Sequence, residues 1–168
     1  MQVILYMAIS VNGMIANSDD GTSWISAEEW NSYSHAVRSA GCLIVGKRTY
    51  HILTKQPEFS EFKDVKIIAV SHESFATISP NHSVAHSPQQ ALEMAKDYKE
   101  IVVAGGGILN ASFLEQNLID EIYLDVEPIV VCEGISLFKN TRFDCKLKFL
   151  GQKMLAENEI QLHYKVLK

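Results

Sequence analysis

The sequence predicts an α/β fold, in which a mixed, mostly parallel sheet is flanked by helices and carries an antiparallel hairpin at its C-terminal end. Apolar runs of strand length alternate with segments of helical periodicity through the middle of the chain. Two of these runs end in glycine-bearing turns that lead into a helix. The last part of the chain holds two long strand-like segments around a turn at residues 157–158.

The N-terminal part is predicted to form a strand, a loop and a helix in that order. Residues 3–9 are an apolar run of strand length. Residues 10–21 contain Asn-Gly and Asp-Gly turn chemistry, with a short extended piece at residues 14–16. Residues 26–40 are predicted to be helical, because a serine and a glutamate three residues later have capping-box spacing and a glycine follows the last residue. The apolar stripe of this helix is Trp30, Tyr33, Val37 and Ala40.

The middle of the chain alternates strands with helices, which favours parallel strands joined by crossover helices. Ser87 and Pro88 open one of these helices, and Gln90 completes a capping box there. The predicted strands are residues 42–45, 65–70, 83–85 and 101–104, and the predicted helices are residues 49–53, a segment from residue 87 onward, and residues 108–116.

The C-terminal part is predicted to be strand-rich. Residues 121–131 form one such stretch, and residues 146–155 and 159–167 are expected to pair as a hairpin. Apolar and polar residues alternate strictly along the second arm, which is typical of a half-exposed antiparallel strand at the edge of a sheet.

Length and composition exclude several functional classes. The 168 residues fit one domain, which we place at residues 1–168. Fifteen Lys and Arg against twenty Asp and Glu give a net charge of −5, which argues against nucleic acid or a membrane surface as a partner. The start has no basic segment, and no apolar run approaches the ~20 residues of a membrane span. Three widely spaced cysteines and scattered histidines predict reduced thiols, a cytoplasmic location and no metal site.

The glycine run Gly105-Gly106-Gly107 is the first candidate site. It follows an apolar strand and opens a helix, where unpaired N–H groups and the positive end of the helix dipole would cradle a pyrophosphate. The spacing is neither that of the Rossmann fingerprint nor that of a P-loop. A simple tight turn between strand and helix is the alternative interpretation.

Two further strand ends carry residues suited to phosphate. Gly46-Lys47-Arg48-Thr49 places two cations and a hydroxyl where a helix begins, and Ser71-His72 ends the strand after it. Ligands of open α/β sheets bind beyond the carboxyl ends of the strands, where all these turns are expected. The alternatives are a solvated Lys-Arg pair and an ordinary surface turn.

The segment at residues 24–29 combines an aromatic residue with two carboxyls at the start of a helix. A carboxyl of Glu28 or Glu29 that is partly buried beside the Trp24 indole would have a raised pKa and serve as a proton donor. The alternative is that Glu29 completes the capping box with Ser26 and that Glu28 complements the helix dipole. Spacing alone favours the cap.

Several of these motifs together resemble one known family. Residues 8–16 and 45–50 resemble the opening blocks of the dihydrofolate-reductase-like superfamily, and residues 103–109 with 118–124 and Pro128-Ile129 resemble its C-terminal half. The match covers nearly the whole chain in order. It is most similar to the reductase domain at the C-terminus of the bacterial riboflavin-biosynthesis deaminase–reductase.

The resemblance implies a dihydrofolate-reductase-like fold that binds NADPH across the carboxyl ends of the sheet, and often forms a homodimer. It implies that the loop at residues 10–23 acts as a lid, and that Gly134 lies in a turn near the subunit or substrate side. It assigns the pyrophosphate to Gly105, Gly106, Gly107, Ile108 and Leu109, the adenosine-side phosphate to Gly46, Lys47, Arg48 and Thr49, the 2′-phosphate region to Ser71 and His72, and the nicotinamide walls to Ala8, Gly13 and Ile15.

The resemblance also implies catalytic and substrate-binding residues. Glu29 matches the substrate-binding acid of dihydrofolate reductases, and Trp24 lies at the matching place in the cleft. The riboflavin reductases carry a candidate catalytic Asp where this chain has Asn12, an amide that cannot relay a proton. An arginine for a folate glutamate tail has no evident counterpart between His51 and Lys66.

We therefore expect an NADPH-dependent reductase that transfers a hydride to a small heterocycle of the pterin or pyrimidine kind. The same-class alternatives are a true dihydrofolate reductase and a riboflavin-pathway reductase. The different-class alternative, which Asn12 favours, is a non-catalytic nucleotide-binding homologue.

Overall fold

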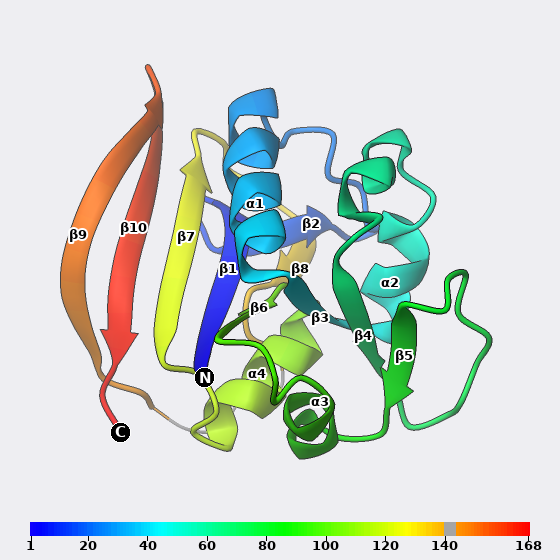
Figure 1. The fold of residues 1–168 in the computed structure, drawn as a ribbon. Coiled ribbons are helices and arrows are strands. Elements are labelled where there is room, and N and C mark those ends of the chain that lie inside the picture. Colours follow the sequence, from blue (N-terminus) through cyan, green and yellow to red (C-terminus); the bar gives the residue numbers. More distant parts are fainter. Residues whose placement is uncertain (140–143) are drawn as a thin grey trace.

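The computed structural model describes residues 1–139 and 144–168, in which eight strands form one sheet (Figure 1). The first six strands across the sheet run parallel, whereas the hairpin strand next to them runs antiparallel. The strands lie in the order β5 (His82–Ala85), β4 (Lys66–Val70), β3 (Cys42–Gly46), β6 (Glu100–Val103), β1 (Gln2–Ser10), β7 (Glu121–Glu127), β10 (Glu159–Val166) and β9 (Leu147–Ala156). The predicted mixed sheet with a C-terminal antiparallel hairpin is confirmed.

The helices cover both faces of this sheet. They are α1 (Ala27–Ala40), α2 (Lys47–Leu53), the short 3₁₀ helix η1 (Pro57–Phe62), α3 (Pro88–Met94) and α4 (Gly107–Glu115). Helix α2 begins two residues earlier than predicted, because Gly46 is extended and acts as its N-cap. The first turn of α2 therefore contains the two cations, which the sequence places where a helix begins.

Strand β1 shows how the core is divided. Val3 and Leu5 pack with the side chains of α3 and α4, whereas Ile4 and Tyr6 pack with those of α1, α2 and η1. All four side chains are buried. A strand with apolar side chains on both faces is typical of a parallel sheet between two helical layers.

A separate two-stranded antiparallel sheet lies beyond the end of β1. It pairs β2 (Met14–Asn17) with β8 (Gly134–Ser136) and buries a small third cluster of side chains. A Cβ atom on Gly134 would lie 2.5 Å from the backbone oxygen of Ala16, so this glycine is needed for close strand packing. The strand predicted at residues 121–131 ends earlier, at Glu127.

The β9–β10 hairpin forms one edge of the sheet (Figure 1), with its turn at residues 157–158 as predicted. Its outer strand leaves Leu147, Phe149, Leu150 and Met154 between 40% and 57% exposed. In the described ranges, no helix is both long enough and apolar enough to cross a lipid bilayer.

Candidate active site

A cleft of about 1270 Å³ opens where β1, β3, β4 and β6 end. This volume exceeds the roughly 300–1,000 Å³ of a pocket for one drug-sized ligand, so the cleft has room for a dinucleotide and a second molecule. The predicted site residues that line it are Ala8, Ile15, Glu29, Gly46, Lys47, Arg48, Thr49, Ser71, His72, Gly105, Gly106, Gly107, Ile108 and Leu109.

The two glycine-bearing turns are direct neighbours. The backbone N–H of Gly46 donates to the oxygen of Gly105 over 2.8 Å, and the residues of both turns face the same cleft. Helix α4 starts there with Gly106 as its N-cap and no side-chain cap. The N–H groups of its first turn are thus available to an anion in the cleft.

The glycine turn is shaped by contacts that the sequence did not reveal. Gly105 has a φ of 85°, a region that favours glycine, and its N–H donates to Oδ1 of the buried Asn110 over 3.0 Å. Nδ2 of Asn110 in turn donates to the oxygen of Leu137. Asn110 therefore ties the turn to the segment after β8. The sequence signal that could have pointed to this role is an asparagine inside a short apolar helix.

Close packing of the backbone against Ser136, and not access for a ligand, requires a glycine at position 107. A Cβ atom there would lie 2.3 Å from the oxygen of Ser136, and the N–H of Lys139 donates to the oxygen of Gly107. This close contact brings Lys139 to the rim of the cleft beside the start of α4. Lys139 is a cation at the predicted pyrophosphate turn that sequence reasoning missed.

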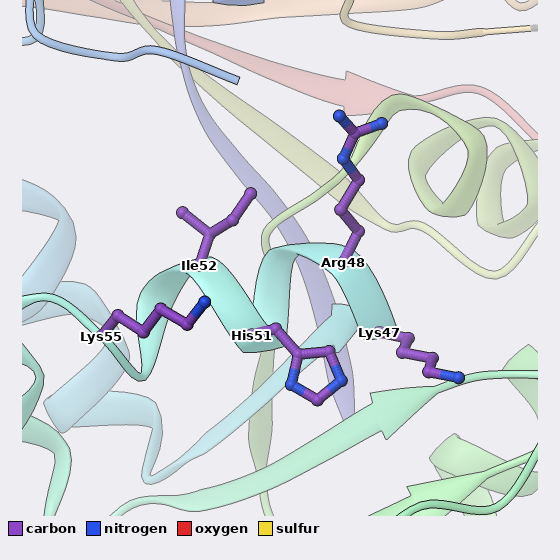
Figure 2. Close-up of a pocket in the computed structure, with 5 residues that line it drawn as sticks. All are labelled: Lys47, Arg48, His51, Ile52 and Lys55. Carbon is purple, nitrogen blue, oxygen red and sulfur yellow. The ribbon is translucent and has the colours of Figure 1, made fainter. Parts of the chain in front are cut away.

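The cations of α2 are held by acidic partners. The Nε of Arg48 donates to Oδ2 of Asp20 over 2.7 Å, and Lys47 lies 3.2 Å from Glu73. Figure 2 shows Arg48 and Ile52 projecting from one side of α2, with Lys47 and His51 on the other. These four residues and Lys55 also line a shallow hollow of about 420 Å³ on the helix.

Glu29 is the buried acid among the residues that line the cleft. Its side chain is only 4% exposed, and its carboxyl makes no hydrogen bond to the part of the chain that the structure describes. Burial raises the pKa of Glu29 well above its usual range, and the nearby charges of Asp125, Glu127 and Glu159 raise it further. Both effects favour the protonated form of this carboxyl.

Only one of the two hydrogen bonds of the predicted capping box is present. The Oγ of Ser26 does accept from the N–H of Glu29 over 2.9 Å. The N–H of Ser26, however, donates to Oε1 of Glu127 over 2.7 Å, so the carboxyl of Glu29 has no part in the cap. The sequence could not identify this partner because it lies 101 residues away.

Further buried acids lie behind Glu29. Oδ2 of Asp125 accepts from the hydroxyl of Tyr6 over 2.6 Å, and its Oδ1 accepts from the amide of Gln161 over 2.8 Å. Burial is the main reason that the pKa of Asp125 rises to about 6. Burial likewise raises the pKa of Glu159, whose Oε2 accepts from the hydroxyl of Ser26.

Four predicted site residues do not line the cleft. Asn12 accepts from the N–H of Val131 and donates to the oxygen of the same residue, so its amide joins two loops and is not free to act on a ligand. Gly13 has a φ of 81° in the same turn, and the side chain of Glu28 is exposed outside the cleft. The indole N–H of Trp24 is buried and finds no partner in the described residues. Trp30, which the sequence placed in the core, packs against a core cluster and also lines the cleft.

Known proteins resemble this chain in sequence and in fold. A model of the RibD C-terminal domain family matches residues 1–159. The chain is 30% identical over 170 residues to Uncharacterized protein YwjB of Bacillus subtilis (strain 168), covering 97% of each. It is 29% identical over 132 residues to Dihydrofolate reductase type 1 of Escherichia coli, covering 76% of this chain and 78% of that protein.

The fold is also similar to that of a solved bifunctional enzyme. A diaminohydroxyphosphoribosylaminopyrimidine deaminase/5-amino-6-(5-phosphoribosylamino)uracil reductase from Thermotoga maritima matches with a TM-score of 0.76 at 15% identity. The match covers 99% of this chain but only 56% of that one. At this identity, the comparison describes the fold.

Proposed function

The chain belongs to the RibD C-terminal domain family, and from this membership and the geometry of the cleft we propose that it is an NADPH-dependent reductase. The proposed substrate is a small heterocycle of the pterin or pyrimidine kind. The observation that carries the proposal is a pair of adjacent phosphate-competent turns that share one cleft with the buried Glu29, whose pKa is raised by burial.

The residues present fit the diphosphate of a dinucleotide. The uncapped start of α4 offers backbone N–H groups, and Gly106 leaves the approach to them open. Lys139 adds a positive charge at this turn. On the adenosine side, Lys47, Arg48 and His72 supply donors for a phosphate monoester, which favours NADPH over NADH.

When bound, the nicotinamide ring would supply the hydride. The buried side chains of Ala8 and Ile15 would form an apolar wall for that ring and exclude water. Trp30 and Tyr33 of α1 also line the cleft and offer aromatic surface for a flat heterocycle. Glu29 would accept N–H donors from the substrate ring or return a proton to it.

The charges of the residues that follow the start of α2 and line the cleft favour a substrate without an anionic tail. The segment after the start of α2 contributes Ile52, Leu53, Gln56 and Glu58 to the cleft, which are apolar, neutral or acidic side chains. Lys55 of the same segment lines the hollow on α2 instead. This distribution of charge favours a small pterin or pyrimidine over dihydrofolate with its glutamate.

Binding and turnover measurements test the proposal. Tryptophan fluorescence should show binding of NADPH, and NADPH absorbance should fall when a dihydropterin or aminopyrimidine is added. Absence of binding by both NADPH and NADH would overturn the proposal. Binding without oxidation across pterins, pyrimidines, dihydrofolate and phosphoribosylated aminopyrimidines would favour the non-catalytic homologue.

We also propose that the protein forms a homodimer through the hairpin edge. Leu147, Phe149 and Met154 are exposed apolar side chains spread along β9, and Phe149 packs edge-on against Tyr164 of β10. Exposed apolar surface of this kind is typical of a protein interface. A second copy would cover it with the same residues, since homodimers pair identical surfaces.

A further inference from the structure

The start of helix α1 is capped in an unusual way. In a complete capping box, the carboxyl of Glu29 would bend back and accept from the N–H of Ser26. Here that N–H is already bonded to Oε1 of Glu127 over 2.7 Å. The position that Glu29 would take in the box is therefore occupied by a side chain from another element.

Two strands of the sheet supply this cap. Glu127 is the last residue of β7, and Glu159 is the first residue of β10, the strand antiparallel to it. The hydroxyl of Ser26 donates to Glu159 over 2.7 Å, so both polar hydrogens of Ser26 are bound by carboxyls from the sheet. Both glutamates are 3% exposed. Water does not compete freely for these bonds.

This arrangement leaves the carboxyl of Glu29 facing the cleft. Glu29 still donates its backbone N–H to Ser26, which fixes the helix turn that carries it. The groups that act on its carboxyl are Asp125 and Glu127 from β7 and Glu159 from β10, and it lies close enough to Tyr6 and Tyr33 to affect both hydroxyls. All of these groups are acidic or neutral, so the surroundings favour the protonated form of Glu29.

We propose that Glu127 is a positioning residue, which holds the N–H of Ser26 and so keeps the carboxyl of Glu29 out of the helix cap and in the cleft. Its charge also helps Glu29 to retain a proton. The consequence for catalysis rests on the proposed reductase function, whereas the placement of Glu29 can be measured without any substrate.

Two variants separate these effects. In Glu127→Ala, the N–H of Ser26 loses its acceptor, and the carboxyl of Glu29 should take it and complete the capping box. In Glu127→Gln, the amide oxygen still accepts that bond, so Glu29 should stay in the cleft but give up its proton at lower pH. Glu121→Gln is the matched control, because Glu121 begins the same strand and bonds His163 instead.

Nuclear magnetic resonance of the backbone amides provides the test. In Glu127→Ala, the Ser26 amide signal should follow the titration of Glu29, and a crystal structure should show the two groups bonded. In Glu127→Gln, the midpoint of the Glu29 titration should fall. A Glu29 carboxyl that stays in the cleft in Glu127→Ala, or a midpoint that is unchanged in Glu127→Gln, would overturn the proposal. If Glu127→Ala does not fold, the titration of Glu29 in Glu127→Gln still tests the proposal.

Kinetics then connect the placement to turnover. Once a substrate is identified, Glu127→Ala should lower kcat by roughly 100-fold, which is the loss expected when a general acid is removed. The affinity for NADPH should not change. Glu127→Gln should restore most of the rate and shift the pH profile to lower pH. If no substrate is turned over, the reductase proposal fails while the amide titrations still decide the role of Glu127.

Discussion

The Nε atom of Arg48 donates to Oδ2 of Asp20 over 2.7 Å, which joins the loop between β2 and α1 to the first turn of α2. Both side chains line the cleft, and Arg48 is also a cation assigned to a cofactor phosphate. The ion pair and the phosphate therefore compete for one guanidinium. Binding of the cofactor should loosen the expected lid loop from α2.

Charge reversal at Arg48 should weaken NADPH binding, whereas removal of the charge at Asp20 should strengthen it. Arg48→Glu should weaken NADPH more than NADH, since only NADPH carries the 2′-phosphate. Asp20→Asn should tighten NADPH several-fold, because Arg48 is released. Fluorescence titration measures both, with Lys55→Glu as a control outside the cleft. Equal losses for both nucleotides in Arg48→Glu would contradict the placement of the phosphate.

Replacing the carboxyl of Glu29 should separate binding from turnover. Glu29→Gln should lower kcat by about 100-fold at neutral pH, while NADPH affinity stays within a factor of two. The protonated acid is the active form, so the wild-type rate should fall as pH rises through the raised pKa of Glu29. Stopped-flow measurement of hydride transfer against pH checks this. A rate that increases over the same range would indicate that the carboxylate is the active form.

The buried acids should make the protein less stable as the pH rises. A carboxyl with a raised folded-state pKa binds more protons in the folded chain than in the unfolded one, so its ionisation opposes folding. The pKa of Asp125 rises to about 6, and its ionisation costs on the order of 2 kcal/mol between about pH 4 and pH 7.

Urea unfolding at a series of pH values measures this dependence. The unfolding free energy should decrease from pH 4 to pH 7, and Asp125→Asn should flatten the decrease. A free energy that rises steadily across the window would show that ion pairs elsewhere outweigh the buried acids.

Two neighbouring glycines should respond differently to alanine. Gly107→Ala places a methyl group 2.3 Å from the oxygen of Ser136 and should cost about 1–3 kcal/mol of unfolding free energy. Gly106→Ala meets only the hydroxyl of Thr49 at 3.5 Å and should fold normally. Its methyl group should weaken NADPH instead, because it lies at the diphosphate turn. Thermal unfolding with NADPH titration distinguishes the two, and equal destabilisation by both would count against this assignment.

The proposed dimer can be tested at Phe149, which is 53% exposed. Phe149→Glu would bury a charge in the interface and should convert the protein to a monomer in sedimentation experiments. Ile78→Glu is the matched control, since Ile78 is 63% exposed on a loop outside the hairpin. A wild-type protein that sediments as a monomer would refute the dimer.

The order of most elements could be predicted because each of them has a local signal, whereas η1 and β8 were not predicted. Alternating strands and helices, capping serines and the turn at residues 157–158 all act over a few residues, and the structure agrees with them to within a few positions. The adjacency of the two glycine turns followed from the rule that parallel strands end at one edge.

The details of the site depend on contacts between distant residues. Glu127 replaces Glu29 in the cap, Asn110 holds the glycine turn, and Lys139 reaches the cleft through packing at Gly107. None of these contacts leaves a periodic or spacing signal, so sequence reasoning favoured the cap for Glu29 and did not find the other two.

The placement of β1 also constrains how the protein is made. This apolar strand precedes both of its neighbours in the chain, β6 and β7, which pair with it through residues 100–103 and 121–127. The growing chain must therefore hold this aggregation-prone strand without its full set of partners until residue 127 has left the ribosome. Chaperones that bind short apolar segments would be expected to engage this strand during translation.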